Sequence, residues 1–176
     1  MARRCVIVPE NLADMGVIVP HFLLMRDPRI VPVADKMWEK AGGDQDRMIE
    51  TVFDFITTHI YYITDREAFD SEEFMGTPYE IAALGYGDCG NSSQLMESLL
   101  YFKGVPSRMV FGYAMGQSHR WVEARYKEKW MVFDTTNGDV FPTAEREKKG
   151  YDALFFVTPY SFALAKMQFV PPLFLP

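Results

Sequence analysis

The stretch that decides the fold runs from residue 85 to residue 136 and reads GYGDCGNSSQLMESLLYFKGVPSRMVFGYAMGQSHRWVEARYKEKWMVFDTT. Cys89 follows a glycine-rich turn, His119 lies on a strand-like run, and Asp134 ends the next such run. Cysteine-based acyl transfer needs a thiol nucleophile, an imidazole base and a carboxylate that orients the base. The stretch therefore predicts a catalytic triad of Cys89, His119 and Asp134, which the rest of the chain would bring together.

Cys89 is expected at the first turn of a helix. Residues 89–103 carry apolar side chains at helical spacing, Gly104 suits the C′ position, and Pro106 prevents continuation. A helix N-terminus carries partial positive charge and unpaired N–H groups, which stabilise a thiolate and supply one oxyanion donor. A small buried cysteine without a chemical role is the alternative. Glycines are expected to leave room for a substrate backbone at positions 85, 87 and 90.

His119 and Asp134 are the expected partners of the thiol. If their two strands pair as a hairpin, the carboxylate accepts the imidazole N–H and fixes its tautomer. Asp139 is a weaker candidate for the same role. The alternatives are a surface histidine on a strand and an aspartate that only begins a turn. The other two histidines, His21 and His59, have no comparable neighbours, and we expect them to be structural.

Two helices are expected before this stretch, at residues 33–41 and 44–59. Gly42 and Gly43 would end the first helix, and Asp44 suits the N-cap of the second. Apolar residues of the second helix recur at helical spacing up to its end. That apolar stripe predicts a helix that faces the core, and it needs no functional explanation.

The segment that connects these helices to the glycine-rich turn has three parts. Residues 61–64 are β-prone and predicted to be extended, and the acidic residues 65–76 are predicted to form a loop. Residues 77–80, Thr-Pro-Tyr-Glu, combine an N-cap, a proline at the first helical position and a capping-box glutamate. They predict a short helix that ends near Gly85.

Three strand-like runs follow the nucleophile helix, at residues 107–113, 118–126 and 129–133. A two-residue connection between the second and third runs predicts a hairpin. Beyond Asp134 the pattern is harder to interpret, and the aromatic residues 151–169 show no clean period. Helices, then a nucleophile helix, then antiparallel strands predict an α+β fold.

Length and composition predict one domain over residues 1–176, with its core at residues 44–136. A net charge of −6 argues against binding to nucleic acid or to an anionic membrane. No apolar run suits a signal peptide or a membrane span, so we expect a cytoplasmic protein and leave a virus-encoded or exported origin open. Cys5 and Cys89 are expected to be free thiols. No metal or other cofactor is expected, because zinc-ligand spacing and a phosphate-binding glycine motif are both lacking.

Five short pieces between Thr77 and Thr136 resemble, in order and spacing, the core of the transglutaminase-like superfamily. They are residues 87–90 (GDCG), 104–108 (GVPSR), 110–113 (VFGY), 119–123 (HRWVE) and 129–136 (KWMVFDTT). The resemblance implies a papain-like α+β fold with the nucleophile helix packed on an antiparallel sheet, here preceded by extra helices. It also implies Cys89, His119 and Asp134 as nucleophile, general base and orienter. Two residues depart from the usual pattern: Arg120 stands where a small residue is usual, and Thr135 where proline is frequent.

The resemblance implies acyl transfer on a peptide or protein amide through a thioester. Hydrolysis by a peptidase or amidase is the favoured outcome; cross-linking to an amine and a catalytically silent binding module are the alternatives. The candidates for a second oxyanion donor are Tyr61, Tyr62, Tyr79 and Tyr86. Tyr62, Tyr86 and Trp121 are the candidates for oxyanion or substrate contact. Tyr62 is preferred among the tyrosines, because a tyrosine after that helix recurs in the proteins that this chain resembles. The apolar N-terminal arm, residues 15–33, would wrap on the core or bind a protein partner.

Overall fold

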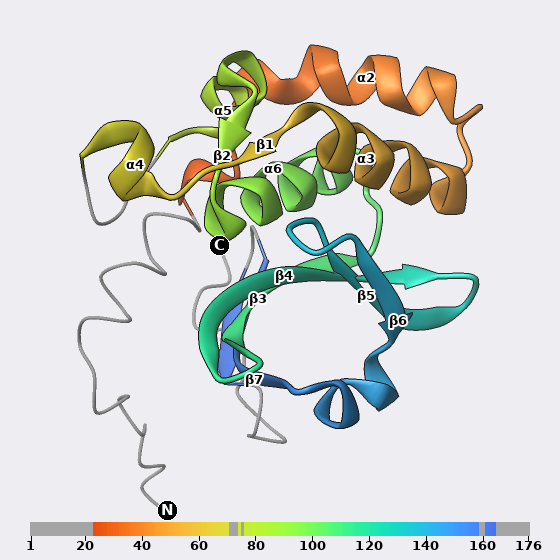
Figure 1. Cartoon of the computed structure of the whole chain (residues 1–176). Coiled ribbons are helices and arrows are strands. Elements are labelled where there is room, and N and C mark those ends of the chain that lie inside the picture. The colour runs from red at the N-terminus through yellow and green to blue at the C-terminus, as the bar shows by residue number, and fades with distance from the viewer. Residues whose placement is uncertain (1–22, 71–73, 75, 159–160, 165–176) are drawn as a thin grey trace, which may run out of the picture.

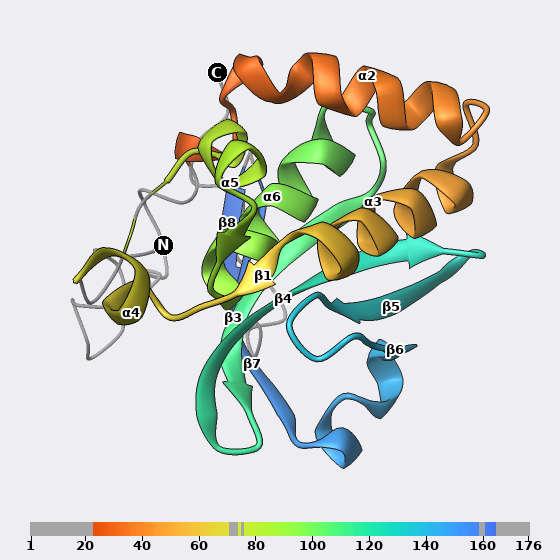
Figure 2. The ribbon, with the colours of Figure 1, turned by 45° about the horizontal axis from the view of Figure 1, so that its top comes forward.

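A layer of helices covers one face of a strongly curved β-sheet (Figure 1). The computed structural model describes residues 23–70, 74, 76–158 and 161–164. Helix α6, Cys89–Tyr101, lies between the other helices and the strands (Figure 2). The predicted α+β fold is therefore confirmed, with a nucleophile helix on an antiparallel sheet and additional helices before it. Cys5, residues 15–22 of the N-terminal arm and the end of the chain lie outside the described residues.

The two predicted N-terminal helices are present. They are α2, Val31–Lys40, which follows the 3-10 turn η1, Pro28–Ile30, and α3, Gln45–His59. The carboxylate of Asp44 caps α3 by accepting the backbone N–H of Arg47 at 2.9 Å. Between the helices, Gly42 and Gly43 have φ values of 66° and 74°, which glycine adopts without a Cβ penalty. No helix in the described part of the chain is long and apolar enough to cross a bilayer.

Each of the next two helices begins with a capping box. They are α4, Asp65–Phe69, and α5, Pro78–Leu84. In α5, Thr77 and Glu80 satisfy each other's backbone N–H groups, as the sequence predicts. Thr64 and Glu67 do the same for α4. The prediction of a loop over residues 65–76 is therefore wrong for its first five residues, because this second capping box supports one helical turn within the acidic segment.

A two-stranded parallel ladder leads directly to the nucleophile helix. Strand β1, Tyr61–Tyr62, pairs with β2, Tyr86–Gly87. The backbone N–H of Tyr61 donates to the carbonyl of Gly85 at 2.8 Å, and that of Ile63 donates to the carbonyl of Gly87 at 3.2 Å. The glycine-rich segment before Cys89 is therefore held against the end of α3, and it is more than the tight turn that the sequence predicts.

The main sheet has six antiparallel strands among the described residues, in the order β6-β5-β4-β3-β7-β8. The strands are β3 Ser107–Ala114, β4 Gln117–Tyr126, β5 Lys129–Asp134, β6 Asp139–Pro142, β7 Tyr151–Thr158 and β8 Ser161–Leu164. Two 3-10 turns, η2 Thr143–Glu145 and η3 Glu147–Lys149, join β6 to β7. Lys127 and Glu128, both at positive φ, form the predicted β4–β5 hairpin connection. The three predicted strands are confirmed to within one or two residues.

Both faces of the sheet are buried, and each packs in its own cluster. Val122, Ala124 and Phe133 face the helices and pack with the apolar residues of α3 and α6. On the concave face, Trp121 and Tyr151 lie among Val110, Val132 and Phe141. Because the sheet curves around this second cluster (Figure 1), side chains from β4, β5, β6 and β7 meet there.

Strand β7 shows why the sequence after Asp134 has no readable period. Its register against β3 shifts between Phe111 and Gly112, so that Leu154 has no paired residue. Tyr151 and Ala153 pack in the concave cluster, whereas Phe155, after the shift, packs on the other face. The irregularity exchanges the two faces within one strand, and no single alternation describes it.

Candidate active site

Cys89 is the first residue of α6, and its thiol is free and partly exposed. Asp88 caps the helix: its carboxylate accepts the N–H of Asn91 at 2.9 Å, and the Asn91 amide oxygen accepts the N–H of Asp88 at 3.2 Å. The N–H of Cys89 belongs to the first turn, which has no intrahelical acceptors. The thiol therefore lies where the helix dipole favours its anionic form.

The glycines around Cys89 make room for the protein's own side chains. A Cβ on Gly87 would lie 2.7 Å from the Cβ of Asn91, the capping residue. A Cβ on Gly90 would lie 2.1 Å from Nη1 of Arg120. Gly85, at φ 74°, ends α5 in the left-handed conformation. The expectation that these glycines leave space for a substrate backbone is therefore corrected, because at positions 87 and 90 the space is already filled.

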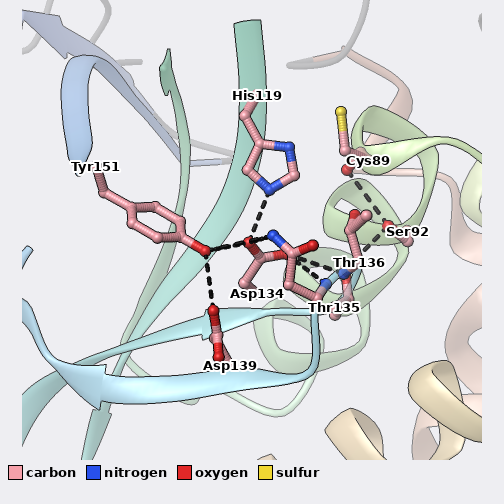
Figure 3. Close-up of polar contacts among 9 residues, drawn as sticks. Cys89, Ser92, His119, Asp134, Thr135, Thr136, Asp139 and Tyr151 are labelled. Carbon is pink, nitrogen blue, oxygen red and sulfur yellow. Dashed lines mark hydrogen bonds and ion pairs between the residues drawn. The ribbon is translucent and has the colours of Figure 1, made fainter. Parts of the chain in front are cut away.

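The imidazole of His119 lies between the thiol and the carboxylate (Figure 3). Its Nε2 is 2.7 Å from Oδ2 of Asp134, and its other edge faces Cys89. Burial alone would lower the pKa of His119, but hydrogen bonds and charge interactions with Asp134 and Cys89 outweigh burial and raise this pKa to about 9. The environment thus favours the charged imidazolium form of His119.

Asp134 accepts hydrogen bonds on both carboxylate oxygens and is completely buried. Besides the imidazole, Oδ2 accepts from the Tyr151 hydroxyl at 2.6 Å and from Nδ2 of Asn137 at 2.9 Å. Oδ1 accepts the backbone N–H groups of Thr136 and Asn137 at 2.9 and 3.2 Å. Although burial raises the pKa of Asp134, these bonds outweigh it and hold the pKa below its ordinary value. The carboxylate is fixed as an anion, pointing at the imidazole.

Two site residues were missed from the sequence, Tyr151 and Asn137. Tyr151 comes from β7, the strand without a readable period, and Asn137 comes from the turn after β5. Only the Asn-Gly pair at residues 137 and 138 is a recognisable turn signal. Asp139, the weaker candidate for the orienting role, lies on β6 with its Oδ2 3.4 Å from the Tyr151 hydroxyl. The structure places Asp134 in contact with the imidazole and Asp139 behind the tyrosine.

Tyr62, Tyr86 and Trp121 occupy three different positions. Tyr62 is 53% exposed. Partial burial raises the pKa of its phenol, and charge interaction with Cys89 raises it further, so the phenol lies within electrostatic reach of the thiol. Tyr86 is half-buried on β2 and lies beside the ring of Phe69. Trp121 is completely buried behind the imidazole, with ring centroids 6.3 Å apart. The expectation of substrate contact is therefore wrong for Trp121.

The two residues that depart from the usual pattern both contact the first turn of α6. Nη1 of Arg120 lies 3.9 Å from Oδ2 of Asp88, and its guanidinium packs over the ring of Phe111. The hydroxyl of Thr135 donates to Oγ of Ser92 at 2.9 Å in the interior. Together they tie β4 and the end of β5 to the helix that carries the thiol.

Comparison with known proteins assigns the family. The family model of the transglutaminase-like superfamily matches residues 32–135. This chain belongs to the transglutaminase-like superfamily. YebA, an uncharacterized protein of Bacillus subtilis, is 26% identical over 127 residues, which are 61% of this chain but only 16% of YebA. The matched part is thus a small fraction of that relative's length.

Two solved structures with a similar fold belong to bacterial proteins. Calcium-bound LapG of Legionella pneumophila superposes with a TM-score of 0.60 at 18% identity, over 81% of this chain and 93% of LapG. A putative cysteine protease from Cytophaga hutchinsonii superposes with a TM-score of 0.50 at 16% identity, over 90% of this chain and 60% of that one. At these identities the likeness establishes the fold.

Within the described residues, no cluster of three or more His, Cys, Asp or Glu side chains could hold a metal ion.

Proposed function

We propose that the protein is a cysteine-dependent amide hydrolase, a peptidase or amidase, that works through a thioester on Cys89. The observation that carries the proposal is the alignment of three side chains. One edge of the His119 imidazole faces the Cys89 thiol, and on the other edge Nε2 lies 2.7 Å from the buried carboxylate of Asp134. Nucleophile, base and orienting group stand in the order that thiol catalysis requires. Similarity to a structure described as a putative cysteine protease supports the same reading.

The reaction follows from the charges of these groups. The Cys89 thiolate attacks the amide carbonyl, and the new oxyanion receives hydrogen bonds from the N–H of Cys89 and from the hydroxyl of Tyr62. The imidazolium of His119 gives its proton to the departing amine and leaves a thioester on the sulfur. His119 then takes a proton from water, the hydroxide attacks the thioester carbonyl, and the C–S bond breaks, which releases the acid product and re-forms the thiolate beside the imidazolium. Throughout, Asp134 stays ionised and holds the imidazole in one tautomer.

The two alternative functions differ from this proposal in the acceptor that they use or in lacking catalysis. A transferase would use a primary amine in place of water and release a new amide. A silent binding module on the same fold would have no need of a connected thiol, imidazole and carboxylate, and the contacts around Asp134 argue against it. The proposed substrate is a peptide or protein amide, and the proposed location is the cytoplasm.

The first test compares the alkylation rates of the two cysteines. We expect iodoacetamide to modify Cys89 at least about tenfold faster than Cys5 at pH 7, because the site favours the thiolate. His119→Ala should abolish the difference, whereas His59→Ala, at the exposed end of α3, should leave it intact. Mass spectrometry of the peptides reports both rates in one sample. Equal rates in the unmodified protein would count against an activated thiol.

The second test identifies the acceptor. The protein is incubated with a peptide-amide library, with and without an added primary amine, and the products are identified by mass spectrometry. Free acids in both samples establish hydrolysis, amine adducts establish transfer, and no product in either sample supports the silent module. Cys89→Ala controls for contaminating activity.

A further inference from the structure

Tyr151 is the one tyrosine hydroxyl among the described residues that touches the orienting carboxylate. It donates to Oδ2 of Asp134 at 2.6 Å, and this oxygen also accepts from the imidazole of His119 at 2.7 Å. Tyr151 starts β7, which pairs with β3 and with neither β4 nor β5. The hydroxyl therefore approaches Asp134 from a different part of the sheet than the histidine does (Figure 3).

The ring of Tyr151 is held so that its hydroxyl has little freedom. The side chain is 2% exposed, and its ring packs edge-on against Trp121 and Phe141, with ring centroids 5.2 Å apart in both cases. A third edge contact, at 6.2 Å, is with the imidazole of His119 itself. Because these three ring contacts hold the phenol of Tyr151 in place, its hydroxyl can hold the Asp134 carboxylate in one orientation.

We propose that Tyr151 is a positioning residue of the triad: its hydroxyl holds the Asp134 carboxylate against the imidazole of His119 and takes up part of its negative charge. This inference rests on the proposed function, because it assigns a role within that same site.

Removing the Tyr151 hydroxyl should change the pKa of His119 in a definite direction. A carboxylate that loses a hydrogen-bond donor becomes a stronger acceptor for its remaining partners, so removing the hydroxyl should strengthen the Asp134–imidazolium pair and raise the pKa of His119. The ionisable groups around this imidazole come from several elements: Cys89 and the capping Asp88 on α6, Arg120 on β4, Asp134 on β5, Asp139 on β6 and Tyr151 on β7.

The substitution Asp139→Asn should shift the pKa of His119 in the opposite direction. Its Oδ2 lies 3.4 Å from the Tyr151 hydroxyl, so it is a second, weaker acceptor for the same proton. Asp139→Asn removes a negative charge near the site and leaves the hydroxyl to Asp134 alone. Both effects lower the pKa of His119. The shift should be small, because Asp139 is exposed and its charge is screened.

The experiment measures the pKa of His119 by NMR titration of the imidazole in full-length variants. We expect Tyr151→Phe to raise this pKa by about 0.5 to 1 unit, and Asp139→Asn to lower it by a smaller amount. The matched control is Tyr126→Phe, which removes a tyrosine hydroxyl that bonds Glu50 on α3, away from the site. Structural damage alone would not move one titration in two opposite directions. An unchanged or lowered pKa in Tyr151→Phe would overturn the proposal.

Activity adds a second readout once a substrate is known. Tyr151→Phe should reduce kcat about 3- to 10-fold with little change in KM, because positioning acts on the chemical step. The alkaline limb of its pH profile should move upward together with the histidine titration. The NMR result does not depend on turnover, so the failure of the proposed function and the failure of this inference can be told apart.

Discussion

Two buried carboxylates on either side of the α6–sheet interface behave in opposite ways. Asp134, at the end of β5, is 0% exposed, and Glu97, in the middle of α6, is 1% exposed. Burial raises the pKa of both, but the donors around Asp134 outweigh burial and leave its pKa below the ordinary value. Burial raises the pKa of Glu97 well above its ordinary value, because the hydrogen bond with Ser107 and the charge of Arg108 offset burial only in part. Equal burial thus goes with a lowered pKa at one carboxyl and a raised pKa at the other.

A third buried carboxylate shows what decides the difference. Glu123, on β4, is also 0% exposed, and it accepts from Arg108 at 2.6 and 2.9 Å and from Arg146 at 2.6 Å. Asp134 has no arginine within ion-pair distance among the described residues, and neutral donors and the imidazole surround it. The three carboxylates are equally buried and differ in the kind and number of their donors. Asp134 keeps its charge available for the imidazole because no arginine competes for it.

Asp134→Asn should give the largest effect on activity. Whichever way the amide turns, its NH₂ group faces donors: the imidazole and the Tyr151 hydroxyl on one side, or the backbone N–H groups of Thr136 and Asn137 on the other. The imidazole loses its fixed tautomer, and kcat should fall on the order of 10³- to 10⁴-fold. Steady-state kinetics at pH 7 measure this.

The control for this prediction is Asp54→Asn, an exposed aspartate on α3, which should leave kcat unchanged.

The pH dependence of the stability of Asp134→Asn gives a second check, whose direction follows from the pKa of Asp134. Because the folded-state pKa of Asp134 is lowered, its contribution to stability is present above the unfolded-state pKa and is lost as pH falls through the folded-state pKa. The variant should therefore lose more stability at pH 7 than at pH 3. A variant with kcat within tenfold of the unmodified protein would remove Asp134 from the proposed mechanism.

Glu123→Gln should give the largest effect on stability. The substitution leaves Arg108 and Arg146 partly buried without their anionic partner, which typically costs about 3–5 kcal/mol. For a chain of this size the melting temperature should fall on the order of 10 °C. Arg146 also lies between η2 and η3, in the segment that leads to Tyr151, so the loss should reach the site as a reduced kcat.

The matched control is Glu128→Gln, in the hairpin that follows the same strand. Its side chain is 85% exposed and pairs with Arg125, so the change should cost less than about 1 kcal/mol. Differential scanning calorimetry of both variants makes the comparison. Similar small losses in the two would mean that the buried pair contributes no more than a surface pair, and the contrast among the three carboxylates would lose its basis.

The sequence predicts those parts of the fold that depend on local signals. Asp44, Thr77 with Glu80, and Gly104 mark helix ends through contacts within a few residues, and the structure has each of them. The family pattern likewise places Cys89, His119 and Asp134 on one helix and two adjacent strands, which the structure brings together.

What the sequence does not predict depends on distant pairing. Strands β1 and β2 have two residues each, and their partners lie 25 positions apart, so neither has a period of its own. Tyr151 reaches Asp134 through a strand whose register shifts at Leu154. Trp121 is not a substrate contact, because both faces of β4 are buried, and the alternation of β4 does not tell which face meets solvent.

Glu97→Gln should give the smallest effect, with the opposite sign: a gain in stability. One carboxyl oxygen of Glu97 has no hydrogen-bond partner among the described residues, so ionisation there is costly. A raised folded-state pKa means that stability is fully present below the unfolded-state pKa and is lost as pH rises toward the folded-state pKa. The neutral amide does not undergo this loss. Urea unfolding at pH 8 should therefore show a gain of about 1–3 kcal/mol over the unmodified protein.

The pH dependence separates this explanation from a simple packing effect. Between pH 5 and pH 8 the advantage of Glu97→Gln should grow, because the carboxyl of Glu97 ionises more readily in the unfolded protein than in the folded one, whereas the amide does not ionise in either. An equal difference at both pH values would indicate packing alone, and a loss at pH 8 would show that Glu97 is stabilised as an anion after all. Glu39→Gln, an exposed change on α2, should show neither trend. A gain at Glu97 beside a loss at Asp134, measured at one pH, would establish that donor number decides the charge of a buried carboxyl in this fold.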